Sequence, residues 1–252
     1  MEQSQFSAAE FKTILAYGRK IEVANIRAAR QVKARTLRML TPAYERLIAS
    51  IEACCGAFDE LHLDLDLAKS DGVAQAYALV MQVVSGGPLV RDAILQGHYV
   101  QACSLLRQEG ELAVQAHNLL EGRFDITPDG DIRLREGEKG GRSGVPRWWL
   151  GKERIETYGH LSSVAHPRSM KAILHMGSAP IDGPNVPDGA RLLSADPHFD
   201  SASAAALMAS HLDDMGWTAH AMIAIAERVS ESVIARRIES IMVAPLSSVR
   251  FE

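Results

Sequence analysis

The sequence predicts an all-α protein, built as an antiparallel helical bundle with a small β-hairpin excursion. Ala, Leu, Glu, Arg, Gln and Met dominate most of the chain, whereas runs of β-branched residues are scarce, and this composition favours helix. Apolar residues recur at spacings of three and four in the long segments. The breaks between these segments are short, and short connections join antiparallel neighbours.

Length and composition limit the classes to which the chain can belong. Its 252 residues are 47% hydrophobic and 23% charged, which excludes a disordered, collagen-like or disulfide-scaffold protein. The net charge of −4 excludes a generally polycationic nucleic-acid binder. Neither side of the glycine-rich stretch 122–151 has an obvious core of its own. We therefore expect a single helical domain over residues 1–252, with 122–151 as a hairpin and flexible insertion.

Breaks divide the first half of the chain into helical segments. Residues 7–40 form the first, and Thr41-Pro42 ends it because proline fits the first turn of a helix but not its interior. A second helix runs from Pro42 to about Leu67. A third, almost wholly apolar helix is expected to end at 85–88, where a fourth begins, and another helix follows over 99–121. The predicted apolar stripe of the first helix contains Phe11, Ile14, Leu15, Ile21 and Ile26.

The second half mixes loops with helices. Residues 124–127 and 132–135 flank Pro-Asp-Gly, a pattern that predicts a hairpin. Helices are expected from Lys152 to near His166 and over 169–176, before an irregular stretch at 177–197. The last helix should begin with Asp200 or Ser201 as its N-cap and continue to about Glu231.

One constellation of polar residues is spread over two predicted helices. Arg107 and Glu111 are four residues apart and share a helical face, as do Tyr158, Ser162 and His166. If this row is buried among apolar neighbours, it must find hydrogen-bond partners, and Arg107 with Glu111 would supply them. Arginine can hold a small anionic ligand, while glutamate or histidine can move protons. A purely structural network that fixes the register of the helices remains the alternative.

These residues also carry a resemblance. The pattern R-x-x-x-E, followed later in the chain by Y-x-x-L-S-x-x-x-H, resembles a group of uncharacterised bacterial all-α proteins of unknown function. Some of these are placed near the HEPN and abortive-infection families. The matching positions are Arg107, Glu111, Tyr158, Leu161, Ser162 and His166, within residues 104–167. The resemblance implies a helical bundle with this cluster between its helices.

Two further functions are weighed against ligand binding. A HEPN-like ribonuclease of a defence system would use Arg154 and His160, or His166, for acid–base work on RNA, and the motif alone gives this little support. A non-catalytic interaction scaffold, such as a homodimer, is the third candidate. The sequence leaves open whether the chain is an enzyme.

We predict no cofactor and no metal site. His211, Asp214 and His220 lie on the last long helix, but no matching ligands appear on other helices, so we expect a solvated polar face there. Cys54, Cys55 and Cys103 are interpreted as small buried residues, with a reactive thiol as the alternative.

The distribution of charge and the lack of a targeting signal indicate which partners and which compartment to expect. Residues 19–38 hold seven cations and one acid, Glu22, so this segment is +6 and the rest of the chain is −10, given the total of −4. Such a ridge could attract phosphate or an acidic partner, although a solvated helix face is the simpler interpretation. The N-terminus lacks an apolar signal region and no long uninterrupted apolar run occurs, so we expect a cytoplasmic protein with no membrane contact.

Overall fold

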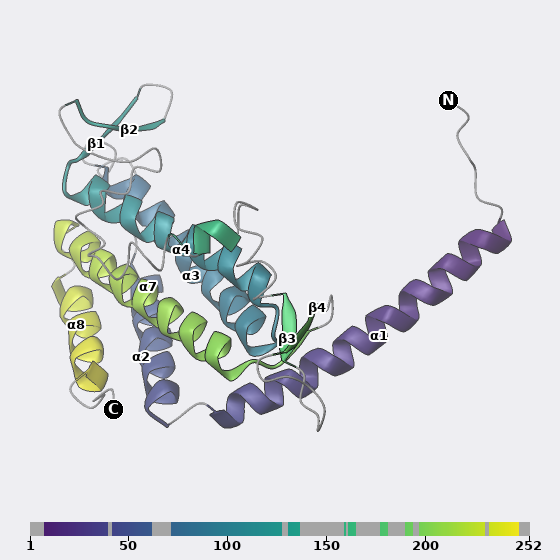
Figure 1. Ribbon diagram of the computed structural model, residues 1–252. Helices are drawn as coiled ribbons and strands as arrows, with labels where there is room; N and C mark the ends of the chain where they lie inside the picture. Colours follow the sequence, from purple (N-terminus) through teal and green to yellow (C-terminus); the bar gives the residue numbers. More distant parts are fainter. Residues whose placement is uncertain are drawn as a thin grey trace, which may run out of the picture.

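The computed structural model describes residues 8–39, 42–61, 72–127, 131–136, 159, 161–164, 177–180, 190–193, 197–229 and 232–246. Most of these residues are helical, and the predicted all-α class is confirmed (Figure 1). The long helices are α1 Ala8–Met39, α2 Pro42–Asp59, α3 Val73–Leu95, α4 Tyr99–Leu120, α7 Ser201–Arg228 and α8 Ser232–Leu246. The strands are β1 Phe124–Ile126, β2 Ile132–Leu134, β3 Ser178–Pro180 and β4 Arg191–Leu193.

The bundle is built around α3, α4 and α7, with α2 and α8 packed beside α7 (Figure 1). A tight turn at 96–98 makes α3 and α4 antiparallel, as short connections require. Helix α7 runs parallel to α4, because Glu109 pairs with His211 and, further along both helices, His117 pairs with Trp217. The long connection between α4 and α7 permits this direction. The predicted antiparallel arrangement holds for α3 beside α4 and for α3 beside α7, whereas α4 and α7 run parallel.

Helix α3 continues through Pro88, and the predicted break at 85–88 is wrong. Proline removes one helical hydrogen bond and crowds the preceding turn. Pro88 faces solvent, however, and the residues on either side of it, Val83 and Val90, are buried in the same apolar cluster. Packing on both sides therefore keeps the helix in one piece.

A backbone junction ties the start of α4 to the start of α7. Gly97 has φ +79°, and a Cβ at this position would run into the carbonyl oxygen of His198. The Tyr99 hydroxyl donates to the Asp200 carbonyl oxygen at 3.2 Å. As predicted, Asp200 is the N-cap of α7, and its carboxylate accepts from the Ser203 amide at 3.1 Å. The segment 197–200 is thereby held against the α3–α4 turn.

The predicted hairpin is present, and a second one was not foreseen. Strands β1 and β2 pair antiparallel with Phe124 opposite Leu134. Strands β3 and β4 also pair antiparallel, with Ser178 opposite Leu193, in the stretch expected to be irregular. Each of these strands has only three residues, and Ser-Ala-Pro carries no strand propensity, so the sequence could not indicate it. Helix α8 was likewise not predicted.

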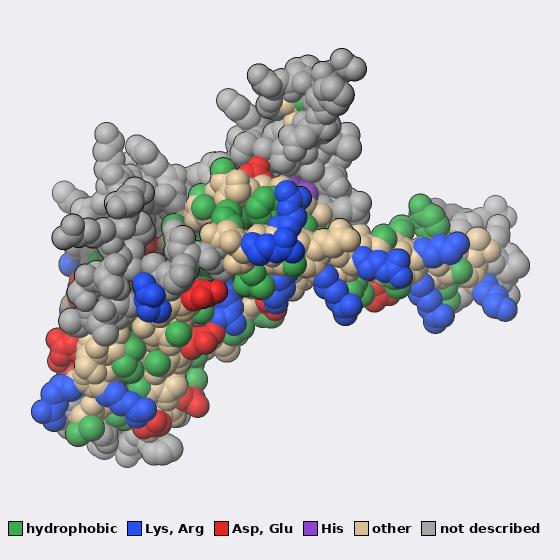
Figure 2. Space-filling view, turned by 90° about the horizontal axis from the view of Figure 1, so that it is seen from below, with side chains coloured by type: hydrophobic (Ala, Val, Ile, Leu, Met, Phe, Trp, Pro, Cys, Tyr) green, Lys and Arg blue, Asp and Glu red, His purple; other side chains and the backbone are tan. Residues whose placement is uncertain are grey.

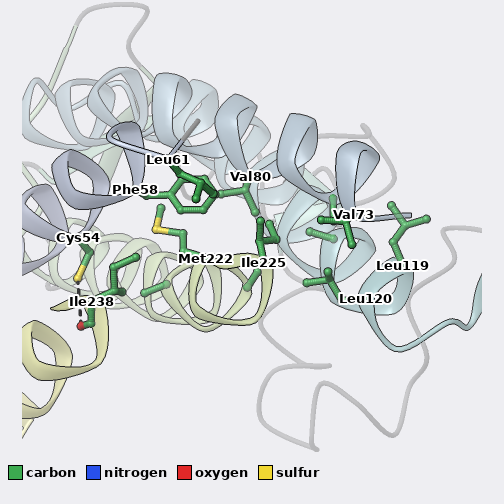
Figure 3. Packing of buried hydrophobic residues seen from close by; sticks show 14 of the residues in the cluster. Cys54, Phe58, Leu61, Val73, Val80, Leu119, Leu120, Met222, Ile225 and Ile238 are labelled. Atoms are coloured by element: carbon green, nitrogen blue, oxygen red, sulfur yellow. Dashed lines mark hydrogen bonds between the residues drawn. The ribbon is translucent and has the colours of Figure 1, made fainter. Parts of the chain in front are cut away.

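Two apolar clusters fill the bundle. The turn-side cluster lies toward the α3–α4 turn and includes Ile94, Tyr99, Leu106, Leu207 and Met208. The hairpin-side cluster lies toward β1 and β2. Figure 3 labels ten of its side chains, which come from α2, α3, α4, α7 and α8, with Leu61 just after α2, and meet in one packed region. Its members include Phe58, Val80, Leu119, Met222, Ile225 and Ile238.

Helix α1 leaves the bundle. Only its C-terminal part packs on α3 and α7, where Ala29, Val32 and Thr36 are buried and Lys33 forms a 2.8 Å ion pair with Asp92 (Figure 1). The single helix predicted for 7–40 is confirmed, but its apolar stripe is not covered by the described part of the chain. Its members Leu15, Ile21 and Ile26 are exposed, while the side chains of Phe11 and Ile14 lie outside the description.

Helix α3 is long and apolar enough to cross a membrane by length and composition alone, and among the described residues it is the one helix that meets this criterion. Core helices meet it as well, and several apolar side chains of α3 are buried in the two clusters. Its hydropathy is therefore weak evidence for a membrane span.

Candidate functional site between the helices

Several polar side chains of α4 and α7 lie among the residues of the two apolar clusters. We call Glu109, His117, Asn118, His211 and Thr218 the polar layer. Its central contact joins Glu109 of α4 to His211 of α7, whose side chains are 3% and 7% exposed. The imidazole Nδ1 lies 2.8 Å from the Glu109 Oε2 atom, so the ring donates to the carboxylate. Two helices that run parallel are thus joined by one buried hydrogen bond.

The position of Glu109 on α4 explains its burial. It follows Ala102 and Leu106 and precedes Ala113 and Ala116 at spacings of four and three, so it takes a core position of the apolar repeat. His211 has the same relation to Leu207 and Met215 on α7. This spacing of apolar residues was visible in the sequence, but it was not used to predict that Glu109 and His211 are buried. The prediction that His211 lies on a solvated face is wrong, because its face of α7 packs against α4.

The other carboxylate oxygen of Glu109, Oε1, is buried and has no hydrogen-bond partner within the described portion of the chain. Helix α3 passes this atom with Gly87, where a Cβ would lie 3.9 Å from Oε1 and 3.7 Å from the His211 ring. A buried polar oxygen without a partner costs about 1–3 kcal/mol. The polar layer therefore contains one acceptor that packing alone does not satisfy.

His117 and Thr218 complete the layer. The His117 Nε2 atom donates to the Trp217 carbonyl oxygen at 2.8 Å, and the two rings meet edge to face at 5.7 Å. Burial lowers the pKa of His117, although the Trp217 carbonyl acts in the opposite direction. Thr218 donates to the Asp214 carbonyl one turn earlier in α7. The layer is held mainly by neutral hydrogen bonds along and between the two helices.

The predicted pair of Arg107 and Glu111 is present on a different face of α4. The Arg107 Nη2 atom lies 2.7 Å from Glu111 Oε1, and the two side chains are 21% and 23% exposed. Residues two apart on a helix point to nearly opposite sides, so this pair does not share a surface with Glu109. The i,i+4 pairing that the sequence predicted is confirmed, and it is partly accessible to solvent.

The second half of the predicted constellation is described in part. Leu161 and Val164 are buried in the turn-side cluster, which also contains Leu106. Ser162 lies between them and is half-buried. The helical turn 161–164 therefore packs on the turn-side cluster, to which Leu106, the neighbour of Arg107 in sequence, also belongs. Tyr158 and His166 lie outside the described residues.

The ribonuclease candidates Arg154, His160 and His166 fall outside the described part of the chain, so that hypothesis stays a sequence-based prediction. Within the described ranges, no group of three His, Cys, Asp or Glu residues could hold a metal ion.

The cysteines lie in the bundle and are poor nucleophiles. Cys54 and Cys103 are buried, and burial raises their pKa values to about 11 and about 12. Burial, with a smaller contribution from Cys54, raises the pKa of Cys55 to about 11. A thiol with such a pKa is protonated at neutral pH and reacts slowly. These values favour the structural interpretation of all three residues.

Comparison with known proteins adds no relative. No family model matches the chain, and searches of curated proteins and of solved structures find no match. The resemblance to HEPN-like and abortive-infection proteins therefore stays a prediction from the residues alone.

Proposed function

We propose that the protein binds a small anionic ligand beside α4, with Arg107 as the anion-binding group. The observation that carries the proposal is the Arg107–Glu111 pair, which is about one-fifth exposed on α4 next to the turn-side cluster. A planar guanidinium presents five N–H donors, a geometry that suits a carboxylate or a phosphate. Glu111 at 2.7 Å holds the guanidinium in place.

The surroundings support binding at this position. The helical turn with Leu161 and Val164 packs on the same apolar cluster as Leu106, the residue that precedes Arg107 on α4. Ser162 on that turn is half-buried and offers a hydroxyl that can donate or accept. On the opposite side of α4, the buried Glu109–His211 contact fixes the helix against α7. A rigid helix that presents a partly exposed cation favours specific recognition.

The test measures thermal unfolding of the full chain with sodium phosphate or sodium acetate, against sodium chloride at equal ionic strength. At ten times the dissociation constant, a bound ligand adds about 1.4 kcal/mol of stability, which corresponds to about 3–6 °C in Tm for a chain of this size. We expect such a shift for the wild type and none for Arg107→Gln.

The matched control is Arg91→Gln, which removes another partly exposed arginine whose partner is Glu52 of α2. This variant should keep the ligand-induced shift. If Arg107→Gln keeps the shift, or if neither anion stabilises the wild type, the proposal is wrong. If Arg107→Gln unfolds the protein without ligand, while Arg91→Gln does not, the Arg107–Glu111 pair stabilises the fold and does not bind a ligand.

A further inference from the structure

The side chains that the structure describes in the N-terminal two-thirds of α1 are exposed, apart from Asn25 and Ala28, which are half-buried. We call residues 8–28 the overhang; it is 21 residues long by its bounds, about 31 Å at 1.5 Å per residue. Ala29 is the first buried residue among the α1 side chains that the structure describes. Figures 1 and 2 show the overhang extending away from the bundle. Its exposed large apolar side chains are Leu15, Tyr17, Ile21, Val23 and Ile26.

The face by which α1 meets the bundle continues along the overhang. Counting back from the buried Val32 in steps of four and three gives 28, 25, 21, 18, 14 and 11. This is the a and d repeat of a helix–helix seam, occupied by Ala28, Asn25, Ile21, Gly18, Ile14 and Phe11. By helical spacing, the cations take positions on the other side of the helix; they are Lys12, Arg19, Lys20, Arg27 and Arg30. Figure 2 shows Lys and Arg side chains along the projecting helix.

We propose that the overhang is a dimerisation helix, which pairs with the overhang of a second copy in antiparallel orientation. In an antiparallel seam, a positions of one helix face d positions of the other, and here facing residues have numbers that add up to 39. Gly18 then faces Ile21 of the second copy, Ala28 faces Phe11, and Asn25 faces Ile14. A small or polar residue meets a large one in every layer, as close packing of two helices requires.

The position of the bundle selects this orientation. Ala29, Val32 and Thr36 are already buried, so the seam face is covered by the chain's own bundle from residue 29 onward. In a parallel pair, the second helix would continue into that bundle. In the antiparallel pair, residue 10 of the second copy lies opposite residue 29, so only residues 8–10 of its helix reach past the point where the bundle begins. Residues 11–28 of the two copies then face each other along the seam.

The seam fits a helix better than a lipid surface. Interfacial helices carry a wide apolar face, whereas this seam is interrupted by Gly18 and Asn25. The Asn25 Oδ1 atom is shielded and has no hydrogen-bond partner within the described chain. An Asn at a seam position is a known means of fixing helix register, at some loss of stability. These features favour a second copy of the chain as the occupant.

The size of the seam predicts a weak dimer. A contact about 27 Å long between two helices about 10 Å wide covers about 270 Å² of each copy, which is below the roughly 800 Å² per partner of a stable complex. We therefore expect a dissociation constant on the order of micromolar. The cations on the outer face remain in solvent and do not meet across the seam.

The test is sedimentation velocity of the full chain over about 1–200 µM, a range that spans a micromolar dissociation constant. We expect a monomer–dimer equilibrium for the wild type, and at least a tenfold weaker association for Ile21→Asp. Val23→Asp is the matched control: Ile21 and Val23 are 43% and 47% exposed, but Val23 lies on the opposite face of the same helix. Val23→Asp should dimerise like the wild type.

The variant Gly18→Leu distinguishes a loss of dimerisation from a loss of helix stability. A Cβ at Gly18 meets nothing within 4 Å in a single copy, so this change should raise helix stability by about 0.5–1 kcal/mol. In the proposed dimer the new side chain collides with Ile21 of the second copy, so association should weaken. If Gly18→Leu strengthens association, the seam is wrong.

A cross-linking experiment tests the register. A mixture of Phe11→Cys and Ala28→Cys chains should form a disulfide between different variants, whereas each variant alone should not. Phe11→Cys cross-linking to itself would contradict the antiparallel orientation. A wild type that stays monomeric throughout the concentration range would overturn the proposal, and binding of that monomer to phosphatidylserine vesicles would assign the overhang to a membrane.

Discussion

Glu109 and His211 show how single residues set the register of this bundle. Each occupies a position that helical spacing reserves for an apolar side chain, and each is buried with the other as its partner. Removing one member of such a pair leaves a buried polar group unsatisfied, which is costly, whereas an apolar pair would specify no particular register. The contact therefore fixes how far along α7 each turn of α4 lies.

The stability of the fold should depend on pH through His117. Burial lowers the pKa of this histidine in the folded state, so the unfolded chain takes up its proton first as the pH falls. The contribution of neutral His117 to stability is fully present above the unfolded pKa of about 6.5 and is lost as the pH falls toward the folded pKa.

The measurement is chemical denaturation between about pH 5 and 7.5, a window around that unfolded pKa. We expect the free energy of unfolding to fall on acidification more steeply in the wild type than in His117→Gln, which keeps a donor for the Trp217 carbonyl. Equal slopes would show that His117 is protonated at no cost in the folded state.

The turn between α3 and α4 depends on Gly97. Its φ of +79° is unfavourable for other residues, and the His198 carbonyl occupies the space that a Cβ needs. Because segment 197–200 leads directly into α7, this close approach also positions the third helix of the bundle. One glycine thus links a local turn to the packing of three helices.

We predict that Gly97→Ala lowers the free energy of unfolding by about 3 kcal/mol or more, since backbone strain and a backbone clash add together. The control is Gly86→Ala, in the interior of α3, where a Cβ meets nothing within 4 Å. That variant should gain about 0.5–1 kcal/mol from helix propensity. Denaturant unfolding followed by circular dichroism gives both values, and similar effects of the two variants would contradict the argument.

In the part of the chain that the structure describes, α3, α4 and α7 each contribute residues to both apolar clusters, and α4 and α7 also carry the polar layer. Continuous helices transmit the unfolding of one cluster to the other. We therefore expect one cooperative transition, in line with the single domain that the sequence predicts.

Two conservative variants test this expectation. Ile94 and Ile225 are fully buried, one in each cluster, and an Ile→Val change costs about 0.5–1.5 kcal/mol. Each variant should shift the same thermal transition by about 1–6 °C, seen alike by far-UV and near-UV circular dichroism, and the double variant should show the sum. Two separate transitions, each sensitive to one variant, would show that the clusters unfold independently.

Much of the fold could be predicted from local signals. Proline at the start of α2, the Asp200 cap of α7 and the pairing of β1 with the nearby β2 depend on neighbouring backbone groups, so the sequence reveals them. The pairing of Arg107 with Glu111 is local in the same sense. By contrast, Pro88 predicted a break that packing on both sides of it prevents.

The sequence by itself determined most of the helices and the i,i+4 ion pair, because these depend on residues within one or two turns. Only the tertiary structure decided that α7 runs parallel to α4, that His211 meets Glu109, and that the first helix projects beyond its bundle with an apolar face uncovered. Those features depend on where distant segments come to lie. Spacing along the chain identifies which face of a helix needs a partner, but long connections leave the choice of partner to the packing of the whole chain.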